Sequence, residues 1–194
     1  MDNELYHFRK EYQLWKACGK KSDDRPALEY VLFDNGYAYA SNAHILAKVS
    51  LKTLAYLDDG DYEKLNGYCI HADALRLLSH YDNIGIEDDG ESVSIVCKIR
   101  ENTLTFGLTP KKRITPPNYE AVLKAEGEHM PIEKIGIEKT FLNNLTDAIG
   151  LKRVKMDFYS ESSKIIVTPI NEDYLDVKGL IMPIMTTGSL DFNN

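Results

Sequence analysis

The sequence predicts an α+β fold built from a repeated module of one strand, one helix and three strands. Two observations support it. Glycine-containing hairpin turns join short strands rich in β-branched and aromatic residues, and a helical pattern precedes each group of three strands. This order occurs three times, with a period of about 65 residues. We therefore expect antiparallel sheets with the helices on one face.

The first module is recognised by its hairpin. Asn35 and Gly36 separate two apolar runs, and such a pair favours a type I′ turn because both central residues need positive φ. Tyr12, Trp15 and Cys18 supply the apolar side of the expected helix. The elements are expected at 5–8 (strand), 10–20 (helix), and 30–33, 37–40 and 45–51 (strands).

The second and third modules follow the same order. Asp88-Asp89-Gly90 predicts the hairpin of module two, and residues 160–163 separate two strands of module three. Module two is expected at 67–70 (strand), 72–80 (helix), and 84–86, 93–96 and 103–106 (strands). Module three is expected at 134–137 (strand), 139–149 (helix), and 154–159, 165–168 and 179–185 (strands). The apolar face of its helix is expected to carry Phe141, Leu142, Leu145 and Ile149.

The connectors suggest how the modules group. Residues 111–131 form a proline-rich, basic linker, and proline ends strands because it lacks a ladder donor. Two modules side by side can share a core, so residues 1–110 are expected to form one complete domain. Residues 132–185 form a half domain, followed by a tail at 186–194. The unpaired module suggests oligomerisation.

Composition narrows the class of protein. The chain has 194 residues, 43% of them hydrophobic and 27% charged, which is ordinary for a soluble globular protein. The net charge of −7 excludes a wholly basic nucleic-acid binder, although a local basic face remains open. No apolar run approaches the roughly 20 residues of a membrane span. We expect a cytoplasmic protein with reduced thiols.

Catalytic signatures are weak. His44, His71 and His80 lack the spacing of metal ligands, and no phosphate loop, dinucleotide fingerprint or nucleophile elbow occurs. Cys69 enters a helix, where a thiol pKa can fall, but a small buried hydrophobe is the commoner role. We expect no enzyme, no cofactor and no metal site.

Three short stretches carry a family resemblance. Residues 40–47 read Ala-Ser-Asn-Ala-His-Ile-Leu-Ala, like the segment Ala-Thr-Asp-Gly-His-Arg-Leu of sliding clamps. Residues 180–185 read Leu-Ile-Met-Pro-Ile-Met, like the clamp's terminal Met-Pro-Met-Arg-Leu. Residues 116–123 are similar to the Pro-Asp-Tyr-x-x-Val-Leu that joins clamp domains. The chain therefore resembles the DNA sliding clamp family, in particular the beta subunit of bacterial DNA polymerase III, shortened to about one and a half clamp domains.

The resemblance implies a peptide-binding pocket. In the family, the first two stretches receive short peptides from polymerases and other clients. By position, the candidates here are His44, Leu46, Met182, Pro183 and Met185. The alternative is that Leu46, Met182 and Met185 are ordinary strand core. This sequence has Asn42, Ala43 and Ile45 in place of the family's Asp, Gly and Arg.

The resemblance also implies a DNA-facing surface. Clamp helices line a channel and contact phosphates through lysine and arginine, without reading bases. The alternative is a solvated polar face. The candidates are Arg9, Lys10, Lys16, Lys20, Lys21, Arg76, Lys152 and Arg153.

The function implied is a non-enzymatic, sliding-clamp-like, DNA-associated factor that tethers or modulates a replication or repair protein, as in processivity. The alternative is a protein-interaction module that keeps the clamp fold but does not encircle DNA. An enzyme is the third reading. The two implied surfaces make duplex DNA and a client peptide the expected partners. Twelve modules close a ring in this family, so further copies of the chain are expected as well. A dimer is preferred and a ring-forming tetramer remains open; no membrane partner is expected.

Overall fold

The computed structural model describes residues 6–20, 24–124, 132, 134–159, 163–171 and 176–184. Within them the strand-helix-three-strand order occurs in modules one and two, and the predicted α+β fold is confirmed. In module three the expected first strand at 134–137 is reduced to an isolated bridge at Gly136 before the helix and three strands. The elements of module one are β1 (His7–Phe8), η1 (Leu14–Ala17), β2 (Tyr30–Asp34), β3 (Tyr37–Ser41) and β4 (Ile45–Ser50). Asn35 and Gly36 both have positive φ, as the turn requires.

The expected helix at 10–20 is wrong in extent. Only the 3₁₀ turn η1 forms there, followed after the loop by a second 3₁₀ turn, η2 (Pro26–Glu29). The backbone N–H of Gln13 donates to the carbonyl of Asp147 at 3.0 Å. Tyr12 and Leu14, two positions apart, are both buried, which a continuous helix would not allow. Tertiary contacts therefore set the path of this segment, and only one 3₁₀ turn forms in it.

Modules two and three follow after short connecting elements. The connection contains α1 (Leu51–Leu54), β5 (Ala55–Tyr56) and α2 (Asp59–Lys64). Module two contains β6 (Tyr68–His71), α3 (Ala72–Leu78), β7 (Ile84–Asp88), β8 (Val93–Ile99) and β9 (Asn102–Gly107), and β10 (Thr109–Pro110) follows it. Module three contains α6 (Lys139–Ala148), β11 (Val154–Asp157), β12 (Ile165–Pro169) and β13 (Val177–Ile181).

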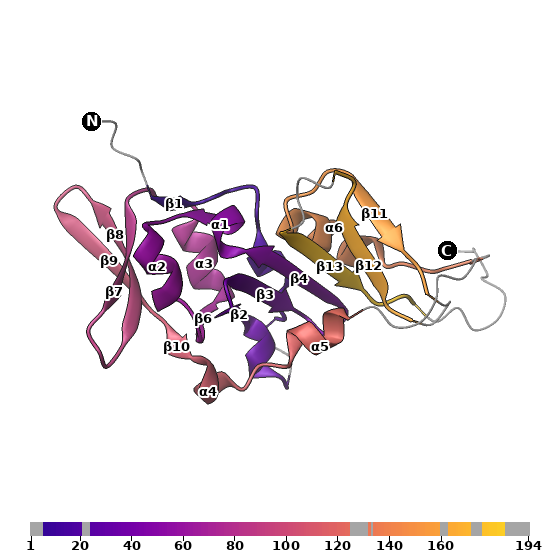
Figure 1. Cartoon of the computed structure of the whole chain (residues 1–194), viewed down its shortest axis with the longest axis horizontal. Coiled ribbons are helices and arrows are strands. Elements are labelled where there is room, and N and C mark those ends of the chain that lie inside the picture. The colour runs from indigo at the N-terminus through magenta and orange to yellow at the C-terminus, as the bar shows by residue number, and fades with distance from the viewer. Residues whose placement is uncertain are drawn as a thin grey trace.

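The strands form one long sheet and two smaller ones (Figure 1). The eight-stranded sheet has the order β10-β6-β2-β3-β4-β13-β12-β11, so it contains strands of all three modules. The second sheet is β7-β8-β9, and β1 pairs with β5. At the junction of modules one and three, β4 and β13 pair over five residues, from Val177↔Val49 to Ile181↔Ile45. The β4–β13 seam makes these two modules continuous.

Modules one and two exchange their first strands. β6, the first strand of module two, pairs with β2 of module one. In return, β1 of module one lies beside β7: His7 bridges to Asp82, and the N–H of Ile84 donates to the carbonyl of Tyr6 at 3.0 Å. Thus β6 joins the sheet of module one, while β1 is linked to module two by one bridge and one backbone hydrogen bond.

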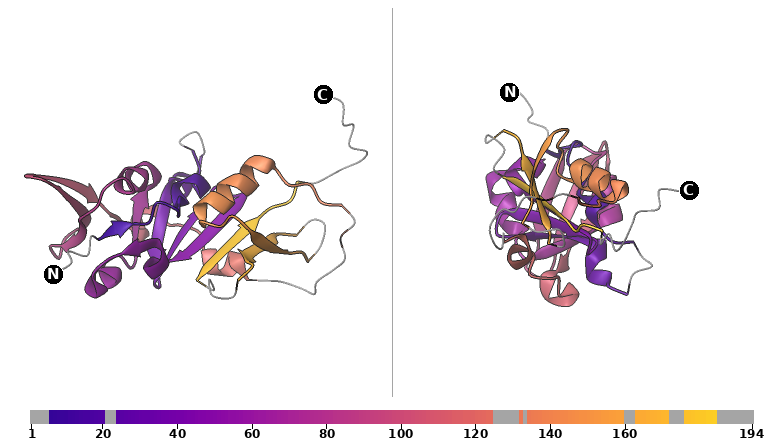
Figure 2. Two further views of the ribbon diagram at one scale, coloured as in Figure 1. Left: turned by 90° about the horizontal axis from the view of Figure 1, so that it is seen from above. Right: turned by 90° about the vertical axis from the view of Figure 1, so that its right-hand side faces the viewer.

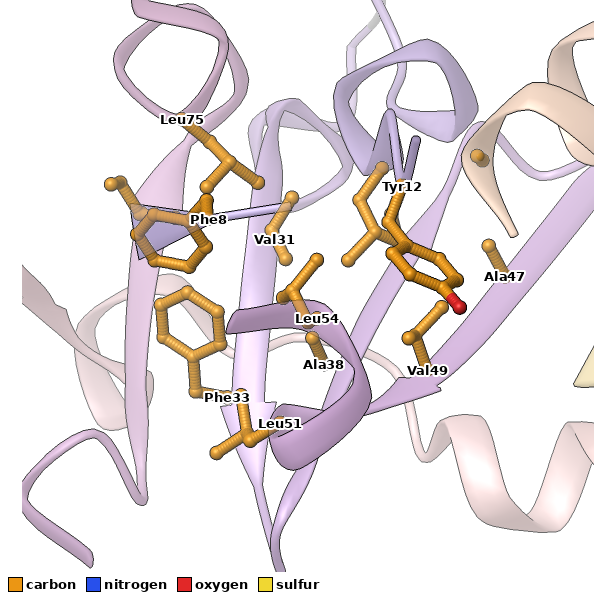
Figure 3. Packing of buried hydrophobic residues seen from close by; sticks show 14 of the residues in the cluster. Phe8, Tyr12, Val31, Phe33, Ala38, Ala47, Val49, Leu51, Leu54 and Leu75 are labelled. Carbon is orange, nitrogen blue, oxygen red and sulfur yellow. The ribbon is translucent and has the colours of Figure 1, made fainter. Parts of the chain in front are cut away.

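The core lies on both faces of the long sheet. The larger cluster packs beneath η1, α3 and α6 and includes Phe8, Phe33 and Leu75, shown in Figure 3. Alternate residues of the strands face the other side, where α5 (Tyr119–Leu123) covers a second cluster. Figure 2 shows α6 and α5 on opposite sides of the sheet.

The segment expected as a linker contains two short helices, α4 (Lys111–Ile114) and α5. Tyr119 and Leu123 are buried, so α5 is packed against the sheet. The division into 1–110, 111–131 and 132–185 stays a prediction. The expected tail at 186–194 and residues 125–131 lie outside the described residues.

Candidate functional site

The turn between β3 and β4 has an unusual backbone. The carboxamide oxygen of Asn42 accepts from the N–H groups of His44 and Ile45, each at 2.9 Å, and Ser41 Oγ donates to the carbonyl of Ile45 at 2.8 Å. Ala43 has φ +75°, in the left-handed region that favours glycine. These bonds hold the turn so that the His44 side chain is exposed.

The segment after β13 is fixed beside this turn. The N–H of Met182 donates to the carbonyl of His44, and the N–H of Ile184 donates to the carbonyl of Gly136, both at 2.8 Å. Gly136 lies three residues before the first residue of α6, Lys139. Backbone bonds alone therefore place Met182, Pro183 and Ile184 between the His44 turn and the N-terminus of α6.

These segments enclose a groove of about 530 Å³, which we call the His44 groove. Phe141 stacks on His44 with ring centroids 4.7 Å apart and planes 12° apart. Met182 is 37% and Ile184 47% exposed, large apolar side chains left open to solvent. The lining residues are His44, Glu138, Thr140, Phe141, Met182, Pro183 and Ile184.

Three of the five predicted pocket residues meet here, namely His44, Met182 and Pro183. Leu46 does not line the groove. It is 2% exposed in the second cluster, with Tyr39, Tyr119 and Leu180. Met185 lies outside the described residues.

A larger hollow adjoins the groove on the helix side. This basic hollow, of about 1220 Å³, shares His44, Thr140 and Phe141 with the groove. It extends from the N-terminus of α6 past η1 to the N-terminus of α3, and η1 packs between the two helices. Its charged lining residues are Lys16, Lys20, Arg25 and Arg76, together with the carboxylates Asp24, Glu29 and Asp73.

The charges of the basic hollow are partly paired. Lys16 forms an ion pair with Asp147 at 2.7 Å, and Arg76 lies 3.6 Å from Asp73. Within the described part of the chain, no ion pair involves Lys20 or Arg25. Exposed pairs contribute little to stability, so these cations remain able to exchange their partners for phosphates.

The other predicted basic residues lie outside the hollow. The Arg9 guanidinium stacks 4.0 Å from the centre of the Tyr56 ring, and Lys10 is exposed beside it. Lys152 and Arg153 are exposed after α6. Lys21 lies outside the described residues.

Sequence reasoning missed several lining residues. Phe141 packs against the large core cluster from the apolar face of α6, and its ring also stacks on His44. Trp15 and Arg25 line the basic hollow. Arg25 follows a loop with no periodic pattern. A sequence signal for Phe141 did exist. It lies in the first turn of α6, whereas the buried residues of this helix, Leu145 and Ala148, come later, so its ring is free to contact a neighbouring segment.

One polar contact fixes α5 on the sheet. Lys48 Nζ lies 2.5 Å from Glu120 Oε1, and the Tyr39 hydroxyl donates to the same oxygen. The hydrogen bond from Lys48, reinforced by that from Tyr39, holds the pKa of Glu120 below its usual range. Burial and this carboxylate raise the pKa of Tyr39.

The described residues carry few features of a catalytic centre. They contain no group of three or more histidine, cysteine, aspartate or glutamate side chains able to hold a metal. Cys18, Cys69 and Cys97 are free and buried, and burial raises the pKa of Cys69 to about 11, so its thiol stays protonated at neutral pH. No helix in this part of the chain is both long and apolar enough to cross a bilayer.

Comparison with solved structures places this fold among the DNA sliding clamps. The relatives found are beta subunits of bacterial DNA polymerase III. The chain matches the beta chain from Streptococcus pneumoniae TIGR4 with a TM-score of 0.59 and 12% identity, over 90% of this chain and 62% of that one. The beta subunit from Streptococcus pyogenes gives 0.59 and 13%, over 96% and 67%.

The beta subunit from Thermotoga maritima gives a TM-score of 0.57 with 9% identity, over 97% of this chain and 66% of that one. The chain thus spans about two thirds of the length of these clamp subunits. The clamp fold predicted from the sequence is confirmed. No protein-family model and no curated protein sequence matches the chain.

Proposed function

We propose that this protein is a sliding-clamp-like, non-enzymatic, DNA-associated factor of the cytoplasm that tethers or modulates a replication or repair protein. The observation that supports it is the arrangement of η1, α3 and α6 side by side, with Lys16, Lys20 and Arg76 around one hollow. Lysine and arginine on such a surface attract phosphates without reading bases. This fits a protein that holds DNA of any sequence.

The proposal is tested by duplex binding as a function of salt. The affinity is expected to fall steeply between about 50 and 200 mM salt, because each phosphate contact releases counterions. The triple variant Lys16→Glu, Lys20→Glu, Arg76→Glu is expected to reduce the slope of log K against log salt by about 3.

The matched control changes the same charge elsewhere. Lys98, Lys112 and Arg113 are exposed on β8 and α4, and they do not line the basic hollow. Their replacement by glutamate is expected to leave the slope nearly unchanged. Equal losses in both triple variants, or no binding by the natural chain at about 50 mM salt, would contradict DNA association.

The His44 groove supports the tethering part of the proposal. Apolar anchors supply most of the energy of peptide binding, and methionine adapts to different partners. Met182 and Ile184 present such anchors beside the ring of Phe141. We expect the groove to take a short, largely apolar segment of a client protein.

Groove binding is tested with short apolar peptides in a calorimetric titration. Met182→Lys is expected to weaken peptide binding at least about tenfold, the cost of losing a good apolar anchor. Ile170→Lys, at an exposed position outside the groove, is the control and is expected to bind normally. Equal affinity of the natural chain and Met182→Lys would argue against this site.

The second candidate function is an interaction module with the clamp fold that does not encircle DNA. The His44 groove supports this interaction module as well as it supports the DNA-associated factor, because peptide binding in the groove does not depend on the basic hollow. Peptide binding that persists while duplex binding is absent at about 50 mM salt would select this function.

A further inference from the structure

Module three leaves one sheet edge open. β11 is the last strand of the eight-stranded sheet, and no strand in the described part of the chain pairs with its outer side (Figure 1). Met156 and Phe158 are partly exposed, although both pack against the large core cluster. An open edge with apolar side chains is a surface for strand addition.

Modules one and two show how the chain fills such an edge. The position of β11 in module three is that of β2 in module one, and β2 is covered by β6. With β6 in place, Val31 and Phe33 are 0% exposed and Ile70 is 1% exposed. The segment of module three that matches β6 is 135–138, which immediately precedes α6.

The match can be given residue by residue. α3 and α6 are capped alike: His71 accepts from the N–H two residues ahead, and so does Glu138. His71 therefore corresponds to Glu138, and Cys69 corresponds to Gly136. In each module the first strand also pairs with the segment that follows the last strand, as Cys69↔Thr109 and Gly136↔Ile184.

The β4–β13 seam gives the match for β11. Its two terminal bonds, Met182 N–H to His44 C=O and Ser50 N–H to Asp176 C=O, are related by a local two-fold axis at Ala47 and Gly179. This axis maps Lys48 onto Leu180. In module one, Lys48 pairs with Tyr39, which pairs with Leu32. In module three, Leu180 pairs with Ile166, which pairs with Asp157. Leu32 therefore corresponds to Asp157.

We propose that a second copy of this chain completes module three: residues 135–138 of each copy pair antiparallel with β11 of the other. Because Leu32 pairs with Cys69, Asp157 is placed opposite Gly136 of the second copy. The remaining pairs are Met156 with Ile137, Phe158 with Ile135, and Lys155 with Glu138.

The chemistry of these pairs is complementary. Met156, Phe158, Ile135 and Ile137 all pack toward the core side, so the two apolar rows meet over one shared core. Lys155 and Glu138 have opposite charges and would meet twice, once on each side of the two-fold axis. A like-charged pair here would have argued against the dimer.

The dimer contains six modules, which is three two-module domains. Its two halves are identical, and the third domain is formed by module three of both copies. This inference goes beyond the proposed function, since the pairing needs neither DNA nor a client.

The test combines solution mass with directed cross-linking of the full chain. Light scattering is expected to give twice the 22.0 kDa of the chain. Glu138→Cys and Lys155→Cys are made separately, mixed and mildly oxidised. The mixture is expected to form a disulfide-linked dimer, because each new thiol faces only the other chain's partner position. The three native cysteines are buried and leave the background low.

The control mixture contains Lys155→Cys and Glu87→Cys, the latter at an exposed position on β7. It and each single variant are expected to give no specific dimer band. A monomeric mass for the natural chain, or a dimer whose 138 and 155 thiols do not link, would overturn the proposal. Neither readout involves DNA, so this failure is distinct from a failure of DNA binding.

Discussion

Ala43 is held in a backbone conformation that costs free energy. Its φ of +75° brings the Cβ too close to the backbone, a strain of about 1 kcal/mol for a residue other than glycine. The turn tolerates it because Asn42 and Ser41 fix the backbone on both sides. This backbone conformation belongs to the turn that places His44 in the lining of the groove.

We therefore expect Ala43→Gly to raise the free energy of unfolding by up to about 1 kcal/mol, since glycine adopts this conformation without strain. Urea unfolding measures the change. Ala40→Gly, in the buried interior of β3, is the control and is expected to destabilise. A destabilised Ala43→Gly would show that the turn is not strained.

Two stacked tyrosines have opposite roles. Tyr119 and Tyr39 stack with centroids 5.7 Å apart, but only Tyr39 has a hydroxyl partner, Glu120. The hydroxyl of Tyr119 is buried with no hydrogen-bond partner in the described part of the chain. An unpaired buried hydroxyl costs about 1–3 kcal/mol.

Removal of each hydroxyl should therefore act in opposite directions. Tyr119→Phe is expected to raise the free energy of unfolding by about 1 kcal/mol, and Tyr39→Phe to lower it by about as much. Thermal unfolding of the two variants provides a matched comparison. The same sign in both would contradict the assignment.

The Glu120 contact predicts a pH dependence. A carboxyl whose pKa is lowered by folding contributes stability above its unfolded value of about 4.5, and this stability is lost as pH falls through the folded pKa. We expect Glu120→Gln to be less stable than the natural chain at pH 7, and the difference to disappear as the pH falls through the lowered pKa of Glu120 in the folded protein. Glu63→Gln, at an exposed position on α2, is the control for charge alone.

At the scale of elements, α6 approaches β13 closely. A Cβ added to Gly179 would lie 2.9 Å from Leu145 Cδ1, and Leu145 is fully buried. The absence of a side chain lets the helix lie on the strand at the β4–β13 seam. The predicted stripe of α6 included Leu145, but the need for glycine opposite it arises only from this tertiary contact.

Gly179→Ala is expected to lower the free energy of unfolding by about 1–3 kcal/mol, the usual cost of overpacking. Gly107→Ala is the control, because a Cβ at that strand position meets nothing within 4 Å. Guanidinium unfolding of both variants measures the difference. Equal stabilities would mean that Leu145 moves aside freely.

Local signals predicted these elements to different degrees. The Asn35-Gly36 turn and the α6 stripe were readable because their geometry is set by neighbouring residues. The expected helix at 10–20 was wrong because a bond from Gln13 to α6 and the burial of Tyr12 decide its path. The groove was predicted only in part, since Phe141 reaches His44 through packing between modules.

At the scale of the whole molecule, one core joins all three modules. The large cluster includes Phe8 and Leu75 from the paired modules and Leu145 and Ile165 from module three. The sequence of the connecting segment 111–131 does not predict this shared core, because the core depends on the β4–β13 seam, which joins strands more than 120 residues apart.

We therefore expect unfolding in one cooperative transition. Trp15, the single tryptophan, packs in η1 between α3 and α6 and reports on that core by fluorescence. Far-ultraviolet circular dichroism reports on all the strands and helices. The two urea curves are expected to coincide. A separate fluorescence midpoint would show that the modules unfold independently.

The β4–β13 seam has one more consequence. His44 in the lining of the His44 groove comes from module one, and the other lining residues come from module three. The groove therefore exists only while β4 and β13 are paired. Whatever occupies the groove must then favour the joined state and oppose separation of the halves, by thermodynamic linkage. A bound client segment would stabilise the pairing of modules one and three, and the melting temperature would rise with the concentration of that segment.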